Sequence, residues 1–310
     1  MAHAFVGTAE LLQLGDGNIS DIKVSQLLEE TPFLKIISAI VASNDTSHEW
    51  LKKTTAPTAG ARAINDGLEN TKAAYTKVTQ ALKLFDAGFD LDLGLLTTKN
   101  GEALMRREAM DHLIAAFVAV EKQIFYGTGN LAAGFAGFAN ETSVDALADT
   151  GGVINATGST ADTASSVWAV RVGEDAVSVV YGLNGRIEVK PSYQTIRAGS
   201  STGNYDVMRT PILFYAGVQV ATSLDLARIV NLTAQTGKGL TDSLLGDLIA
   251  LFPSGRGPTH LVMNRRSLKQ LRASRTATNP TGAPAPFPVE AFGVPIVVTD
   301  SILSTEAIMT

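Results

Sequence analysis

The sequence of 310 residues contains no cysteine. This absence excludes disulfide bonds, cysteine-ligated metals and thiolate nucleophiles, and it fits synthesis in a reducing cytoplasm. Only four histidines occur, and no two of them have the local spacing of a metal site. A serine nucleophile needs a strained strand-to-helix turn and a histidine to take its proton, and we expect none here. The sequence therefore predicts no metal, no other cofactor and no enzymatic activity.

Long apolar runs and an excess of positive charge are also missing. No apolar stretch reaches the roughly 20 residues that cross a bilayer, and the amino terminus has no basic region followed by an apolar run. We therefore expect a soluble protein without a membrane partner. The chain has 25 lysines and arginines and 30 acidic residues, for a formal net charge of -5. This balance argues against tight nucleic-acid binding, although weak, non-specific contact with DNA remains compatible with it.

A glycine-rich stretch, IFYGTGNLAAGFAGFAN, follows a long helical pattern. Its Gly-x-Gly-x-x-Ala order resembles a dinucleotide fingerprint, which requires a strand before the glycines and a helix after them. Upstream, however, the apolar residues have the spacing of a helix over residues 100–126, with Asn100 as its N-cap and Gly127 as a left-handed residue at its end. We interpret the stretch as a hinge, and a nucleotide-binding enzyme stays only as a remote alternative.

Two charged groups deserve comparison with functional sites. Asp90 and Asp92 form an i, i+2 acidic pair that binds calcium only if other oxygens converge on it. Five cations occupy one short predicted helix, and they are Arg265, Arg266, Lys269, Arg272 and Arg275. Because no aromatic residues alternate with these cations, a solvated face or a contact between subunits is favoured over a nucleic-acid surface.

Residues 48–92 predict a long β-hairpin, because two strand-like arms flank Pro57, Gly60 and Gly67. Between Glu49 and Phe85 it carries six basic residues against three acidic ones. The hairpin is either solvated, with lysines that protect its edges, or an arm that lies on an acidic neighbouring subunit. The candidate interface residues are Lys52, Lys53, Arg62, Lys72, Lys77 and Lys83, together with an apolar face of Val78, Leu82 and Leu84.

The remaining patterns predict an α+β protein. Before residue 48, a helix broken at Pro32 leads into a strand. Residues 165–193 alternate with a turn at 173–175, which is typical of a β-meander. A short helix capped by Thr241 follows, and the chain ends with a strand, a helix capped by Asn264 and a final strand.

Taken together, several runs resemble the major capsid proteins of tailed double-stranded DNA bacteriophages, whose fold is called HK-ninety-seven-like. The glycine-rich stretch resembles the segment after that family's spine helix, and SSVWAVRVGEDAVSVVYG is similar to a tryptophan-bearing hairpin of one subgroup. LVMNRRSLKQLRASR followed by FGVPIVVTDSIL resembles the family's ending. The resemblance implies an N-terminal arm at 1–47, an extended hairpin or E-loop at 48–92, a peripheral domain with the spine helix at 93–238, and an axial domain with the C-terminal strands at 239–310.

The resemblance also implies a function. The chain is expected to assemble with itself, as pentamers and hexamers, into an icosahedral capsid that encloses the phage genome, after synthesis in the cytoplasm of a bacterial host. Portal and a separate scaffolding protein are expected partners, since no long scaffolding segment precedes the arm, and packaged DNA is expected to be contacted weakly. The alternative is an encapsulin-type nanocompartment, which shares the fold and encloses cargo enzymes. Lysine–asparagine crosslinking, known in some relatives, is not implied by these residues.

Overall fold

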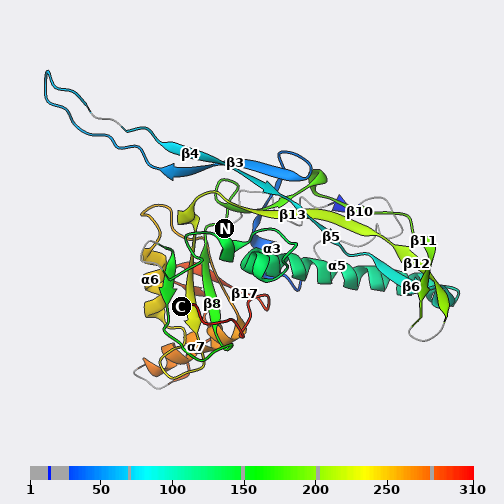
Figure 1. Ribbon diagram of the computed structural model, residues 1–310. Helices are drawn as coiled ribbons and strands as arrows, with labels where there is room; N and C mark the ends of the chain where they lie inside the picture. Colours follow the sequence, from blue (N-terminus) through cyan, green and yellow to red (C-terminus); the bar gives the residue numbers. More distant parts are fainter. Residues whose placement is uncertain (1–12, 15–27, 69–70, 148–150, 200–202, 280–282) are drawn as a thin grey trace.

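A computed structural model describes residues 13–14, 28–68, 71–147, 151–199, 203–279 and 283–310. In Figure 1 a two-stranded arm projects from a body built around one long helix. The α-helices are α3 (Pro32–Ile36), α4 (Leu93–Leu96), α5 (Gly101–Tyr126), α6 (Asp242–Ala250) and α7 (Arg265–Ala277). The strands are β1 (Gln13–Leu14), β2 (Ser38–Val41), β3 (Ser47–Thr55), β4 (Ala74–Ala81), β5 (Lys83–Asp86), β6 (Phe89–Asp92), β7 (Val153–Asn155), β8 (Ser165–Val170), β9 (Val177–Tyr181), β10 (Arg186–Val189), β11 (Tyr193–Ala198), β12 (Asn204–Thr210), β13 (Ile212–Val220), β14 (Leu226–Leu232), β15 (His260–Met263), β16 (Glu290–Ala291) and β17 (Val294–Val298).

The strands form four sheets. The first sheet has the order β1-β10-β13-β9-β2, with β5 paired to β13. The second sheet has the order β16-β17-β15-β8-β14-β7, a small sheet has the order β11-β12-β6, and β3 pairs with β4 alone. Figure 1 shows α5 running beneath the first sheet toward the small sheet at the far end of the body. The expected α+β class is therefore confirmed.

The helix α5 confirms the expectation for residues 100–126. Leu113, Phe117, Val120 and Ile124 recur at steps of three and four and are fully buried, so one face of the helix supports the larger core. Gly127 ends the helix with φ 53° and ψ −131°, a positive φ as expected but outside the left-handed helical region. A glycine is needed there because a Cβ would lie 1.8 Å from Oδ1 of Asn140.

The expected meander at 165–193 is wrong. β8 pairs with β14 and β15 in the second sheet, whereas β9 pairs with β13 and β2 in the first, so the turn at 173–175 carries the chain from one sheet to the other. Both strands are buried along their whole length. In β8, alternating residues face two different cores, and the pattern alone does not identify the partner strand.

The break expected at Pro32 stays a prediction. Pro32 is the first residue of α3, where its missing N–H costs no hydrogen bond. The helix expected before it falls on residues outside the described part of the chain. The strand expected after it is confirmed as β2.

The second sheet separates two hydrophobic cores. Trp168 and Val170 of β8 face the core around α5, whereas Val167 and Ala169 face a second core beneath α6 and α7. The caps of these two helices are confirmed, since the Thr241 and Asn264 side chains accept from the N–H groups of Leu244 and Ser267. Because β7, β8 and β14 share this sheet with β15–β17, the expected boundary at residue 238 does not divide the sheets. The domain assignment itself stays a prediction.

We expect Gly127→Ala to lower the free energy of unfolding by about 1–3 kcal/mol, because the new Cβ meets backbone and side-chain atoms at a positive φ. Gly129→Ala is the matched control, since nothing lies within 4 Å of a Cβ there. Urea unfolding of the unassembled chain measures both variants. Equal stability of the two would contradict the role of Gly127.

Candidate functional site

The acidic pair Asp90 and Asp92 does not converge on one point. Asp90 forms ion pairs with Arg197 at 2.6 Å and with Arg209 at 3.3 Å, and the hydrogen bond from Arg197 lowers the pKa of Asp90. Asp92 instead caps α4 by accepting from the N–H of Gly94. Within the described residues, no group of three or more histidines and acids is placed to hold a metal ion.

The glycine-rich loop is closed by side chains of its own surroundings. The amide of Gln123 donates to the carbonyl of Phe135 at 2.7 Å and accepts from the N–H of Leu131 at 3.2 Å. Oδ1 of Asn140 accepts from the N–H of Thr128 and of Gly137. Since α5 precedes the loop and these N–H groups are already bonded, the arrangement does not match a phosphate-binding loop.

One Gly-x-Ser-x-Gly frame, which the sequence expectation overlooked, spans residues 199–203. It connects β11 to β12, two antiparallel strands. A nucleophile elbow joins a strand to a helix, so this connection does not have that geometry. Its central residues 200–202 lie outside the described part of the chain.

The cations of α7 bind groups of their own chain. Arg265 pairs with Asp300, and Arg275 pairs with Asp242 at 2.6 Å. Arg266 donates to the carbonyls of Thr163 and Leu232. Arg272 likewise donates to the carbonyl of Ala285, so four of the five cations tie α7 to neighbouring segments. Arg265 and Lys269 are nevertheless exposed, so the solvated face and the subunit contact that the sequence favoured both stay predictions.

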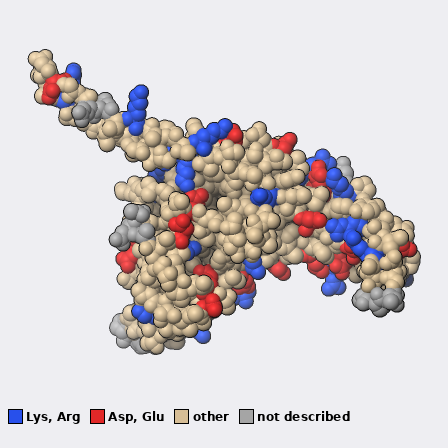
Figure 2. Space-filling model, viewed as in Figure 1, with Lys and Arg blue, Asp and Glu red and all other residues tan. Residues whose placement is uncertain are grey.

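The hairpin arm is the feature that lacks a core of its own. β3 and β4 pair antiparallel from Ser47 opposite Ala81 to Thr55 opposite Ala74, and Figure 1 shows the arm continuing outward beyond these two strands. Large apolar side chains are exposed on it, with Leu51 67%, Tyr75 57% and Ile64 94% exposed. Figure 2 shows the arm standing clear of the body with basic side chains along it.

The expected basic residues are distributed along the arm and its base. Lys52 forms a 2.7 Å ion pair with Glu141 of the body, which anchors the base. Lys77 pairs with Glu49 across the hairpin at 2.6 Å, and its hydrogen bond lowers the pKa of Glu49. Two of the expected contact residues are therefore already engaged within the chain. Lys53, Arg62 and Lys72 lie farther out, and all three are exposed.

The expected apolar face of Val78, Leu82 and Leu84 is not a single face. The strand pairing changes partner at Leu82, because β4 pairs with β3 up to Ala81 and β5 pairs with β13 from Lys83. Leu82 is 5% exposed and packs where Gly217 has no side chain, so it belongs to its own subunit's interior. Val78 is half-buried on the arm, and Leu84 is exposed on the body.

Leu84 lies on a groove beside the long helix. Together with Lys83 it lines a groove of about 600 Å³ between β5, α5 and residues 131–134. Leu131, 44% exposed, stands on the opposite side. Lys83 and Leu84, which the sequence assigned to the hairpin, thus belong to a surface of the body and not to the arm.

A buried carboxylate that the sequence reasoning missed joins three segments of the chain. Oε2 of Glu121 accepts from the N–H groups of Phe33 at 3.1 Å and Leu34 at 3.0 Å, and Oε1 is hydrogen-bonded to the Thr299 hydroxyl. Burial raises the pKa of Glu121, although these hydrogen bonds oppose the rise. The available signal was an acid between Val120 and Ile124 on a buried helix face.

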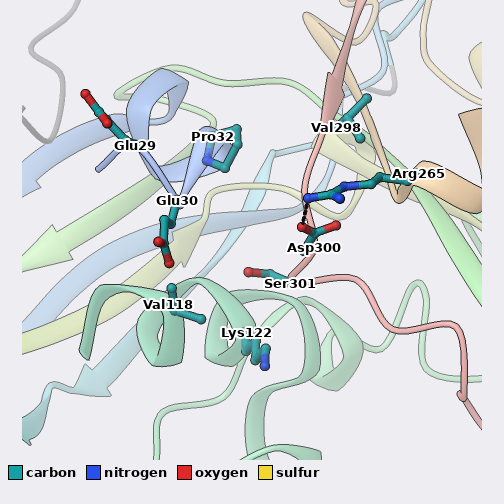
Figure 3. A pocket seen from close by; sticks show the side chains of 9 residues that line it. All are labelled: Glu29, Glu30, Pro32, Val118, Lys122, Arg265, Val298, Asp300 and Ser301. Carbon is teal, nitrogen blue, oxygen red and sulfur yellow. Dashed lines mark hydrogen bonds and ion pairs between the residues drawn. The ribbon is translucent and has the colours of Figure 1, made fainter. Parts of the chain in front are cut away.

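Beside this junction lies a polar groove of about 510 Å³ (Figure 3). The ion pair between Arg265 and Asp300 closes one side, and Lys122 of α5 lies on the other. The groove is lined by Glu29, Glu30, Pro32, Val118, Lys122, Arg265, Val298, Asp300 and Ser301. Because the groove is lined by both acidic and basic side chains, its charge favours neither an anionic nor a cationic ligand.

A projecting hairpin, a long helix under a sheet and a separate sheet with two helices define the class of shell-forming phage capsid folds. In agreement, a chain of bacteriophage Epsilon15 superposes with a TM-score of 0.63 at 19% identity, over 88% of this chain and 87% of that one. A chain of the bacteriophage JBD30 capsid gives 0.52 at 13% identity, over 89% and 92%. A family model described as major capsid protein GP7 matches residues 15–310, and the chain belongs to this family.

Two further comparisons complete this result. An encapsulin of Synechococcus elongatus gives a TM-score of 0.43 at 10% identity, over 67% of this chain and 90% of that one, which is too low to support an argument. No curated protein sequence matches the chain. The family assigns the chain a structural role in a capsid shell made of many copies, located in the virion.

We expect the free energy of unfolding to fall as pH rises above the ordinary Glu121 pKa of 4.5. Because the folded-state pKa is raised, the folded chain binds more protons than the unfolded chain between the two pKa values, so stability is lost as pH increases through that window. Glu121→Gln imitates the protonated carboxyl and should remove this part of the pH dependence.

Urea unfolding of the unassembled chain between pH 5 and pH 8 measures the effect. Glu30→Gln is the matched control, because Glu30 is an exposed carboxylate on the adjoining groove. Identical slopes for the original chain and Glu121→Gln would contradict the assignment. The other titratable groups of the groove, whose effects the control helps to separate, are Glu29, Lys122, Arg265 and Asp300.

Proposed function

We propose that this chain forms an icosahedral capsid of pentamers and hexamers around a phage genome, and that each hairpin arm lies on a neighbouring copy. The single observation that carries the arm's role is the pairing of β3 and β4 with each other alone, outside every other sheet. A two-stranded ribbon with exposed apolar side chains gains its burial from another surface. In a shell, the neighbouring copy supplies that surface.

The charge distribution supports the same proposal. The arm is basic on a chain whose formal net charge is -5, so its outer cations meet a surface that is acidic on average. Individual exposed ion pairs contribute only about 0–1 kcal/mol, but every copy donates one arm and receives another. The acidic balance also favours weak and non-specific contact with packaged DNA.

In this proposal the arm at residues 47–81 is the E-loop, α5 is the spine helix of the peripheral domain, and the second sheet with α6 and α7 belongs to the axial domain. The role is structural and not enzymatic, which agrees with the bonded state of the glycine loop and of the α7 cations. Portal and a separate scaffolding protein are further proposed partners, with assembly in the bacterial cytoplasm, and these rest on family membership alone.

We expect Lys53→Glu combined with Lys72→Glu to leave the subunit folded but to reduce shell formation at low salt. Both positions are exposed on the arm, so the change adds repulsion at each repeated contact without removing core packing. Light scattering and negative-stain microscopy measure assembly, and circular dichroism checks folding. High salt should restore part of the yield.

The matched control is Lys53→Arg with Lys72→Arg, which keeps both charges. Normal shell yield from the glutamate variant at low salt would contradict the role of the arm's charge. Failure of the original chain to form any particle, in the presence of its phage's other capsid proteins, would contradict the shell itself.

A further inference from the structure

A strained turn places an aromatic side chain at the edge of the second sheet. β16 and β17 form a hairpin whose two connecting residues, Phe292 and Gly293, have φ values of 52° and 77°. Two positive φ values are typical of a type I′ turn, in which asparagine followed by glycine is the favoured sequence. A phenylalanine is unfavourable at the first position, because its Cβ crowds the backbone there.

The strain is not compensated by burial within the chain. Phe292 is 64% exposed, and its ring lies beside α6 at Gly246, where a Cβ would be 3.6 Å from the ring. Phe287 and Val289 beside it are 56% and 77% exposed. Three large apolar side chains within six residues thus form one exposed patch, and a strained residue of this kind is retained where it has a function.

The same chain carries an uncharged pocket at the other edge of this sheet, with large apolar side chains beside Ser143 and Ser223 in its walls. A cavity of about 270 Å³ lies beside β7, and its apolar walls include Leu224, Leu226, Leu251 and Phe252. Its nine lining residues include no charged side chain. Leu224 and Leu251 are 51% and 37% exposed at its mouth. Since an apolar cavity of roughly 150 Å³ accommodates benzene, this one has room for a phenyl ring.

We infer that Phe292 of one copy inserts into the Leu224–Leu251 pocket of the next copy in the shell. The turn and the pocket lie at the β16 and β7 edges of one sheet, and both lie at the end where β17 begins, since Leu226 and His260 both pair with Val170. A knob and a hole at different places on one chain make a head-to-tail contact, which closes into a ring when the rotation from copy to copy closes. The inference rests on the proposed shell, but it uses surfaces separate from the hairpin arm.

A second copy is the occupant that these observations favour. Family membership places many identical copies against one another, so every exposed turn has a pocket of the same chemistry available. Neither the turn nor the pocket lining contains a charged side chain, and each contributes large apolar side chains, which matches the anchor-in-pocket arrangement of interface hot spots. The Arg272 guanidinium, 4.4 Å from the centre of the Phe287 ring, supplies a polar margin to the patch.

The first experiment replaces Phe292 with asparagine. Asparagine tolerates the positive φ, so Phe292→Asn should raise the melting temperature of the unassembled chain while it raises the concentration needed for shell assembly by about tenfold. Leu303→Asn, at a leucine 40% exposed and outside both surfaces, is the matched control and should leave assembly unchanged. Unimpaired assembly of Phe292→Asn would overturn the inference.

The second experiment locates the contact, and it uses the absence of natural cysteines. Shells of a Phe292→Cys and Leu224→Cys double variant, mildly oxidised, should give a ladder of covalently linked chains on a non-reducing gel. Each single variant should give none. Linked dimers from Phe292→Cys alone would overturn the pocket assignment, because the turn of one copy would then contact the same turn of another copy.

Other outcomes separate this inference from the proposed function. Shells that form normally but give only single chains after oxidation would contradict this contact and leave the shell and its arm intact. A different phage protein crosslinked to Cys at position 292 would replace the second copy as the occupant. Absence of particles from the original chain would contradict the proposed function itself.

Discussion

The structure depends on the buried face of α5. The fully buried side chains of Leu113, Phe117 and Ile124 form the base of the larger core, and Glu121 on the same helix bonds both the N-terminal helix α3 and the residues after β17. Hydrogen bonds to a buried carboxylate cost much to break, since the donors are then left unpaired. One helix therefore joins α3 near the start of the chain to the segment that follows β17 near its end.

A body that is held together by one helix can leave other segments without a hydrophobic core of their own. The second sheet is buried on both faces by the two cores. Exposed large apolar side chains lie on the hairpin arm, at the Leu84–Leu131 groove, on the small sheet of β11 and β12, at the Leu224–Leu251 pocket and at the turn at Phe292. A solitary soluble protein rarely keeps apolar surface in such positions. In a shell of identical copies the same surfaces become the contacts between subunits, and the rigid body sets where they meet.

Local patterns in the sequence predicted local structure well. The 3.6-residue period gave α5, the capping residues Thr241 and Asn264 marked two further helices, and alternation around turn residues gave the hairpin arm. Strand partners were not predictable in the same way, because β8 and β9 are buried on both faces and their neighbours come from distant parts of the chain. Leu82 was wrongly assigned to an exposed face of the hairpin for the same reason. A change of strand-pairing partner does not alter the alternation of apolar and polar residues along the sequence.

The residues that violate local rules are the informative ones in this fold. Glu121 is an acid on a buried helix face, and Phe292 is an aromatic residue at a positive φ. Natural sequences are locally consistent except where a function requires otherwise. The first exception is resolved within the subunit by three hydrogen-bonding partners. The second is covered only in part, because Phe292 contacts α6 near Gly246 and stays 64% exposed. The physical argument that explains Glu121 from the fold therefore leads, for Phe292, to a neighbouring copy.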